Sequence, residues 1–180
     1  MTTATCLLPA AFEATEPWND RRIRALAMYC SDGRWGDAFD EFCHNRLHIP
    51  RYDRFAVPGG PLWLVMRDIS LIIPHSAARD QLQFLVKAHQ LERIVLFGHY
   101  GCAYYTHLLG REPDGCLAAQ EEDLRVAAKA LSGWFAGMKV EAYMAMRSGE
   151  RLSFRPVPVG PIHIVYSMKS RSSMPRPLPR

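Results

Sequence analysis

The chain carries at residues 23–34 the sequence IRALAMYCSDGR, in which a largely apolar run ends at Cys30 and is followed by an aspartate and an arginine. Such a run predicts a strand that is buried on both faces, as in a parallel sheet covered by helices. A second apolar run, at 94–97, leads in the same way into the sequence HYGC at 99–102. If both strands lie in one parallel sheet, their carboxyl ends bring two thiols and an imidazole together.

Strand and helix patterns alternate along the rest of the chain. The apolar spacing predicts helices at 37–47, 76–90 and 117–135, with Ser76 as the N-cap of the second helix. Short apolar runs predict strands at 23–30, 54–57, 92–97, 140–146, 152–157 and 162–166, and Gly98 is expected to make a sharp exit from the third. The sequence therefore predicts a single α/β domain with a central, mostly parallel sheet of four to five strands flanked by helices.

The two strand ends carry a set of metal-ligand side chains: Cys30, His99 and Cys102. Ligands of open α/β sheets bind off the carboxyl ends of the strands, where the strand order reverses. Two cysteines and a histidine form a zinc ligand set, and three protein ligands leave a fourth position for water or substrate. A lone cysteine at a strand end is more often a core residue. The combination of H-x-x-C with C-x-D-x-R nevertheless favours a site for Zn²⁺.

Length and composition are those of one soluble domain. The chain has 180 residues, 48% hydrophobic and 22% charged, which is enough for one sizeable core and too little for two. We expect an N-terminal arm at 1–20, the zinc domain at 21–168, and a disordered tail at 169–180 that is rich in proline, serine and arginine.

The same composition argues against several classes of partner. The net charge of +4 is partly concentrated in the tail, and no nucleic-acid-reading motif accompanies it. No apolar run reaches the roughly 18–20 residues of a membrane span, and the N-terminus is a poor signal peptide. Five scattered cysteines do not form a disulfide framework, so we expect a reducing, cytoplasmic location. No contact with nucleic acid or membrane is expected.

Asp32 and Arg34 are the candidate catalytic residues. Two thiolates cancel the Zn²⁺ charge, so such a site needs help to hold a bound hydroxide near neutral pH. The Asp32 carboxylate can accept a hydrogen bond from that hydroxide and orient it, and Arg34 can keep the carboxylate ionised. The alternative is that the two side chains form a plain surface ion pair in a turn.

Three sequences together, CSDGR at 30–34, DRFAVPGG at 53–60 and VLFGHYGCA at 95–103, resemble the β-class carbonic anhydrases. The resemblance covers about 23–105 and follows that family's C-x-D-x-R and G-H-x-x-C pattern. It implies that Cys30, His99 and Cys102 bind zinc and that Asp32 and Arg34 form the catalytic dyad, with Asp32 as a possible fourth ligand in a closed state. It also implies a zinc lyase that adds hydroxide to CO₂ to give bicarbonate, reversibly, as a homodimer or dimer of dimers.

The sequence departs from that family at the pocket walls. Gly33 replaces the usual serine, and 58–60 (PGG) stands where many members have Arg-Asn-Ala-Gly. Gly59, Gly60 and Tyr100 become the candidate wall of the substrate pocket, which Tyr104 and Tyr105 could narrow. No glutamine precedes Gln81, so the family's N-terminal glutamine has no evident counterpart.

These departures leave other functions open. The same scaffold could hydrolyse a CO₂ analogue such as carbonyl sulfide or carbon disulfide, or it could hold zinc without catalysis. A redox or nucleophilic protein based on Cys30 is a third hypothesis, although the chain lacks C-x-x-C and Asp32 should raise the pKa of the thiol. Cys43 is expected to pack in a helix stripe. Three acidic residues, Asp37, Asp40 and Glu41, are expected on a solvated helix face, and the remaining histidines are expected at the surface: His44, His48, His75, His89, His107 and His163.

Overall fold

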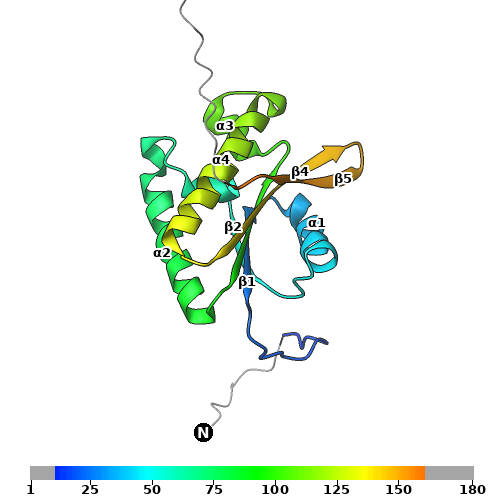
Figure 1. Cartoon of the computed structure of the whole chain (residues 1–180). Coiled ribbons are helices and arrows are strands. Elements are labelled where there is room, and N and C mark those ends of the chain that lie inside the picture. Colours follow the sequence, from blue (N-terminus) through cyan, green and yellow to red (C-terminus); the bar gives the residue numbers. More distant parts are fainter. Residues whose placement is uncertain (1–10, 161–180) are drawn as a thin grey trace, which may run out of the picture.

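The structure, a computed structural model, describes residues 11–160. One five-stranded sheet lies between two layers of helices (Figure 1). Along the chain the strands are β1 (Ala25–Cys30), β2 (Asp53–Val57), β3 (Arg93–His99), β4 (Lys139–Ser148) and β5 (Arg151–Val157). Their order is β2-β1-β3-β4-β5; the first four run parallel and β5 returns antiparallel to β4. The predicted fold class is confirmed, whereas the predicted strand at 162–166 and the tail at 169–180 lie outside the described residues.

The helices follow the predicted alternation with one addition. They are α1 (Gly36–Glu41), which continues into a π-helical turn (Phe42–Arg46), α2 (Ile72–His89), α3 (Ala103–Leu109) and α4 (Pro113–Trp134). The helix α3 is not predicted from the sequence, because seven residues are too few to establish a helical period. No helix within 11–160 is both long and apolar enough to cross a membrane.

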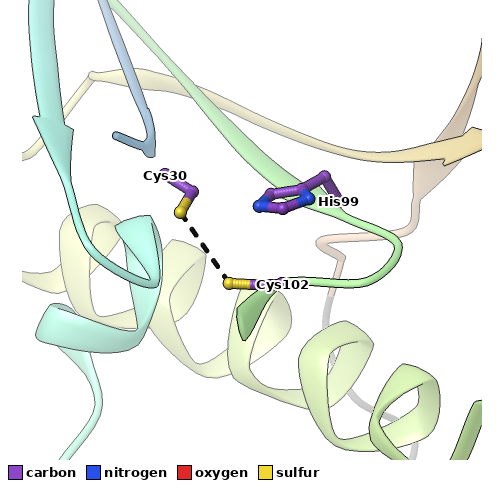
Figure 2. A group of neighbouring side chains, drawn as sticks. All are labelled: Cys30, His99 and Cys102. Carbon is purple, nitrogen blue, oxygen red and sulfur yellow. Dashed lines mark hydrogen bonds between the residues drawn. The ribbon is translucent and has the colours of Figure 1, made fainter. Parts of the chain in front are cut away.

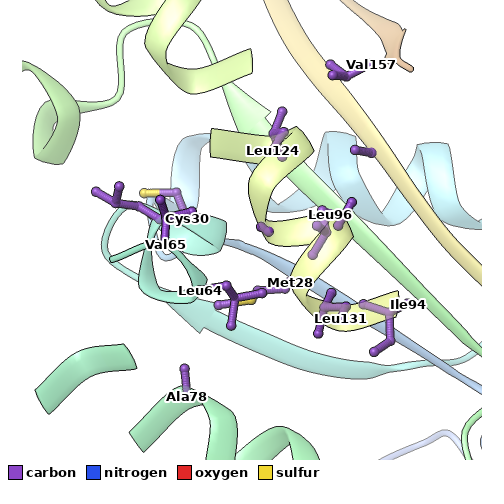
Figure 3. Close-up of a cluster of buried hydrophobic side chains, with 14 of the residues drawn as sticks. Met28, Cys30, Leu64, Val65, Ala78, Ile94, Leu96, Leu124, Leu131 and Val157 are labelled. Atoms are coloured by element: carbon purple, nitrogen blue, oxygen red, sulfur yellow. The ribbon is translucent and has the colours of Figure 1, made fainter. Parts of the chain in front are cut away.

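The two faces of β1 belong to two separate hydrophobic clusters. Leu26 and Met28 pack with side chains of α2 and α4, such as Leu131, on one face (Figure 3). Ala27 and Tyr29 point to the other face, where the α1 layer covers them. Successive side chains of a strand point to opposite faces, so a strand covered on both sides must be apolar throughout. This is the physical reason for the continuous apolar run that ends at Cys30.

Two predictions about element ends are wrong. The helix α2 begins at Ile72 and not after Ser76, because the Asp68 carboxylate accepts from the Ser70 amide and starts a 3₁₀ turn that runs directly into α2. Gly98 does not end its strand, since β3 pairs with β4 as far as His99. The sharp turn comes at Gly101, where φ is +69°.

The strand order reverses between β1 and β3. From β1 the chain moves outward to β2, and it then returns to place β3 on the other side of β1. A reversal of this kind leaves a crevice off the carboxyl ends of the two central strands. Cys30 is the last residue of β1 and His99 is the last residue of β3.

Candidate metal centre

Three ligand-type side chains meet at this crevice. Cys30 ends β1, His99 ends β3, and Cys102 is the N-cap residue of α3. Their candidate ligand atoms all lie within 4.8 Å of one another, and Figure 2 shows the two sulfur atoms and the imidazole ring turned toward a common point. All three residues are buried, with 8%, 1% and 2% of their surface exposed. The predicted convergence of these residues is therefore present.

The spacing and the unpaired atoms of this group fit a zinc ion. A Zn–S bond of about 2.3 Å in a tetrahedral site puts two sulfur atoms about 3.8 Å apart, and the Sγ atoms of Cys30 and Cys102 are 3.8 Å apart. The Nδ1 atom of His99 lies 3.0 Å from the main-chain carbonyl of Tyr100, to which it can donate. Its Nε2 atom is buried and has no hydrogen-bond partner within residues 11–160. A metal ion would bind the lone pair of Nε2. The hydrogen bond from Nδ1 to the Tyr100 carbonyl favours this, because it places the ring proton on Nδ1 and leaves Nε2 free.

The surroundings of Cys30 lower the pKa of its thiol. A hydrogen bond from Cys102 is the largest cause that lowers the pKa of Cys30, to about 4, with help from the Gly59 amide, 3.4 Å from the sulfur. The same hydrogen bond, together with burial, raises the pKa of Cys102. The expectation that Asp32 raises the pKa of Cys30 is wrong, because the Asp32 amide donates to the sulfur and its carboxylate is turned to Arg34. The lowered pKa of Cys30 favours the thiolate, which is the form that binds a metal ion, and metal binding to the pair would release the thiol protons.

Asp32 and Arg34 form a bidentate ion pair beside the ligands. Arg34 donates from Nε to Oδ1 at 2.9 Å and from Nη2 to Oδ2 at 2.5 Å, while its amide donates to Oδ1 at 3.1 Å. The side-chain hydrogen bond from Arg34 is the largest cause that lowers the pKa of Asp32, to about 2. The Asp32 side chain is 16% exposed and that of Arg34 is 74% exposed, so the pair joins a mostly buried carboxylate to a guanidinium that reaches into solvent. This carboxylate does not belong to the metal-ligand group found within 11–160.

A hollow of about 410 Å³ opens onto the same place. Cys30, Asp32, Pro58, Tyr104 and His107 line it, together with Ser31 and Ala103. The Cys30 sulfur and the ionised Asp32 carboxylate therefore face one space that is open to solvent. His107 was expected only as a surface histidine, and its place on α3 beside this hollow depends on a helix that the sequence analysis did not predict.

The two glycines at 59–60 pack closely against residues at and next to the candidate metal centre. A Cβ atom on Gly60 would lie 2.7 Å from the carbonyl carbon of Tyr29, and one on Gly59 would lie 2.7 Å from Cδ1 of Tyr104. Both residues have positive φ, +77° and +52° along the chain. Both are buried, and neither is among the residues that line the hollow, although the sequence analysis expected them to form its wall. Gly59 instead contacts the centre by donating its amide to the Cys30 sulfur.

The other predicted pocket residues are divided between two places. Tyr100 lines a separate hollow of about 170 Å³ with Arg34, Trp35 and Arg147. Tyr105 is buried and donates to Asp123, which also accepts a bidentate pair of hydrogen bonds from Arg67. Sequence reasoning missed this trio, because its members lie far apart in the chain and follow no spacing.

Several remaining side chains can also be assigned. Cys43 is fully buried in the α1-side cluster, as predicted. Asp37 and Glu41 are exposed, as predicted, whereas the Asp40 side chain is 35% exposed, pairs with Arg54 and accepts from the Tyr52 hydroxyl. The ring of Trp35 packs against His99 with 5.0 Å between centroids, which helps to fix the imidazole.

A family model described as "Putative carbonic anhydrase" matches residues 21–151, which is well over half of the chain and includes every side chain of the candidate centre. The chain belongs to this carbonic anhydrase family. No curated protein matches the sequence. Among solved structures, similar chains include a β-carbonic anhydrase of Sordaria macrospora, from a study of two tetrameric enzymes, with 15% identity, coverage of 74% of this chain and 81% of that chain, and a TM-score of 0.47. The β-carbonic anhydrase CafD of Aspergillus fumigatus has 12% identity, coverage of 78% and 94%, and a TM-score of 0.48.

Proposed function

We propose that this chain is a zinc-dependent carbonic anhydrase that converts CO₂ and water reversibly to bicarbonate and a proton. One observation carries the proposal: Cys30, His99 and Cys102 converge with metal-ligand spacing, and Cys30 shares an open hollow with the ionised Asp32. A purely structural zinc site would be closed by a fourth protein ligand. The Asp32 carboxylate instead accepts hydrogen bonds from Arg34 through both of its oxygens.

In this proposal the chain's own residues have distinct roles. Cys30, His99 and Cys102 would hold the zinc ion, which when bound lowers the pKa of a water molecule and supplies the nucleophile. The Asp32 carboxylate would accept a hydrogen bond from that nucleophile and orient it toward the substrate carbon in the hollow. Arg34 keeps Asp32 ionised, and since the pKa of Asp32 is about 2, the carboxylate stays charged throughout the physiological pH range.

The lining of the hollow favours a small neutral substrate. Pro58, Ala103 and the ring of Tyr104 supply much of its wall, and such a surface suits a linear molecule such as CO₂ better than a charged one. Carbonyl sulfide and carbon disulfide have the same shape, so a hydrolase of such an analogue is the second candidate function. All three substrates would use the same carboxylate and ligand set.

The first experiment is stopped-flow CO₂ hydration between pH 6.5 and 9 with protein that carries one zinc per chain. We expect a rate well above that of buffer, and a loss of roughly 10²-fold or more in Asp32→Asn, as for other positioned acid–base groups. Asp37→Asn is the matched control, because Asp37 is exposed on α1. A zinc-loaded protein without CO₂ activity that hydrolyses carbonyl sulfide would favour the second function; inactivity toward both would favour a non-catalytic zinc protein.

We also propose that two copies of the chain associate, as homodimer or dimer of dimers. Large apolar side chains are exposed on α2 and on the segment that leads into it, among them Ile69, Ile73 and Phe84, which are 81%, 80% and 65% exposed.

A reducing, cytoplasmic location is also proposed. The four cysteines of the described region are buried and free, which supports it. The division into an arm at 1–20, a zinc domain at 21–168 and a tail at 169–180 remains a proposal as well.

A further inference from the structure

A basic hollow lies at the amino ends of β1 and β3, the end of the sheet opposite the candidate metal centre. Its volume is about 640 Å³. The segment before β1 lies beside the amino end of that strand and forms one wall (Figure 1). Its charged lining, by which we define the basic hollow, consists of five arginines and one glutamate: Arg21, Arg22, Arg24, Arg51, Arg93 and Glu92.

This concentration of arginine is local. Residues 11–160 contain 18 basic and 18 acidic side chains, because four of the 22 Lys and Arg residues lie in 161–180 and no acidic residue lies outside 11–160. A part of the chain with no net charge therefore gathers five guanidinium groups around one hollow. The cluster of five arginines is therefore not a consequence of an overall positive charge of residues 11–160.

Part of the positive charge in the basic hollow is neutralised. Arg93 pairs through Nε with Glu141 at 2.5 Å. Arg22 and Arg24 share a single carboxylate, that of Glu92, at 3.1 and 3.2 Å. Two arginines therefore face one negative charge, and one positive charge is left over.

The other two guanidinium groups have no carboxylate partner within residues 11–160. Arg51 donates to the main-chain carbonyls of Asn19, at 2.7 Å, and Arg21, and the Arg21 side chain makes no ion pair there. Asp20 is close in sequence but pairs with none of the arginines of the hollow. The basic hollow therefore has a surplus of three positive charges.

Main-chain contacts also hold two of these arginines in place. Besides the contacts of Arg51, Arg22 donates to the carbonyls of His89, at 3.3 Å, and Gln90 at the end of α2. Carbonyl groups fix a guanidinium without cancelling its charge. Guanidinium groups that are fixed in advance lose less entropy when they bind an oxyanion with their planar pairs of N–H groups.

We propose that the basic hollow binds a small ligand that carries a pyrophosphate-type group, at a site separate from the metal centre. Its volume lies in the range of about 300–1,000 Å³ usual for small-molecule sites, and its charge surplus matches a di- or trianion. Arginine forks are suited to bidentate contacts with phosphate oxygens. The arginines surround one hollow and do not form a track across the surface, which favours a small molecule over a nucleic acid.

The test is calorimetric titration of the zinc-loaded full chain with sodium pyrophosphate, and with sulfate for comparison. We expect binding of pyrophosphate that is stronger than that of sulfate and that weakens as salt is raised from 50 to 300 mM. The double variant Arg21→Ala/Arg24→Ala should weaken it by about tenfold or more, and Arg24→Lys by less, since lysine keeps the charge but not the fork. Arg151→Ala removes one positive charge from the β4–β5 hairpin, far from the basic hollow, and should leave the affinity unchanged.

Three results would overturn the proposal. Wild-type protein could fail to bind pyrophosphate at millimolar concentration, the Arg151→Ala control could lose as much affinity as the double variant, or a single-stranded oligonucleotide could bind more tightly than pyrophosphate and compete with it. Zinc content and CO₂ hydration are measured on the same samples and should not change in the double variant. The failure of this site and the failure of the proposed catalytic function are thus observed separately.

Discussion

The Tyr105 hydroxyl donates to Asp123 at 3.0 Å, inside a trio in which Arg67 holds the same carboxylate. Tyr105 and Asp123 are 4% and 1% exposed, and burial, with the nearby Asp123 charge, raises the pKa of Tyr105 well above its usual value. Because Tyr105→Phe removes a donor from a buried carboxylate, we expect it to lower the free energy of unfolding by about 1–3 kcal/mol. Urea unfolding of the zinc-loaded protein measures this.

Tyr104→Phe is the matched control at the preceding position of α3. The Tyr104 ring is half-buried against Gly59, and its hydroxyl has no hydrogen-bond partner within residues 11–160, so the change should stay within about 0.5 kcal/mol. Equal losses in both variants would contradict the buried-trio argument.

The sequence does not distinguish the roles of Tyr104 and Tyr105, because those roles depend on the environment that the fold gives each side chain. A pattern predicts the helix face a residue occupies, but not a carboxylate eighteen positions away.

At the scale of elements, the turn at 59–60 sets how closely the chain can approach β1. Gly60→Ala would place a Cβ atom 2.7 Å from the Tyr29 backbone, at a residue with φ of +52°, so the turn must move away from Cys30. We expect a loss of more than about 1 kcal/mol in unfolding free energy and weaker zinc binding, because the Gly59 amide moves with the turn. Thermal unfolding and competition with a zinc chelator measure the two effects.

Gly133→Ala is the control for this change. Gly133 lies near the end of α4 with nothing within 4 Å of its Cβ position, so alanine should stabilise the protein by up to about 1 kcal/mol. A Gly60→Ala protein that retains its stability and zinc affinity would refute the role of the turn.

The strands β1 and β3 could be predicted from the sequence because strands buried on both faces must be apolar throughout. The start of α2 was misplaced, because the local cap that Asp68 forms with the Ser70 amide was overlooked. The end of β3 was misplaced because pairing with the distant strand β4 sets that end.

At the scale of the whole molecule, the candidate site was predictable because parallel strands that end at one edge bring their next residues together. The HYGC and CSDGR sequences needed only the neighbouring positions of β1 and β3, which the sheet order provides. The basic hollow was not predictable in this way, because Arg21, Arg51 and Arg93 come from three separate segments. Their common location depends on how the segment before β1 packs against the rest of the domain, and the spacing of charges along the chain does not predict that packing.

The exposed apolar side chains of α2 allow the last prediction, which concerns association. Ile73 and Phe84 are eleven residues apart, which is close to three helical turns, so they lie on one face of α2, and Ile69 precedes Ile73 by four positions. If this face pairs with a second copy, light scattering after size exclusion should give at least twice the mass of 20.4 kDa, and Ile73→Lys should shift the protein toward the monomer. Gln83→Lys adds the same charge about a quarter-turn around the helix and should leave the mass unchanged. A monomeric wild-type protein, or an Ile73→Lys variant that still associates, would show that this face is not the interface.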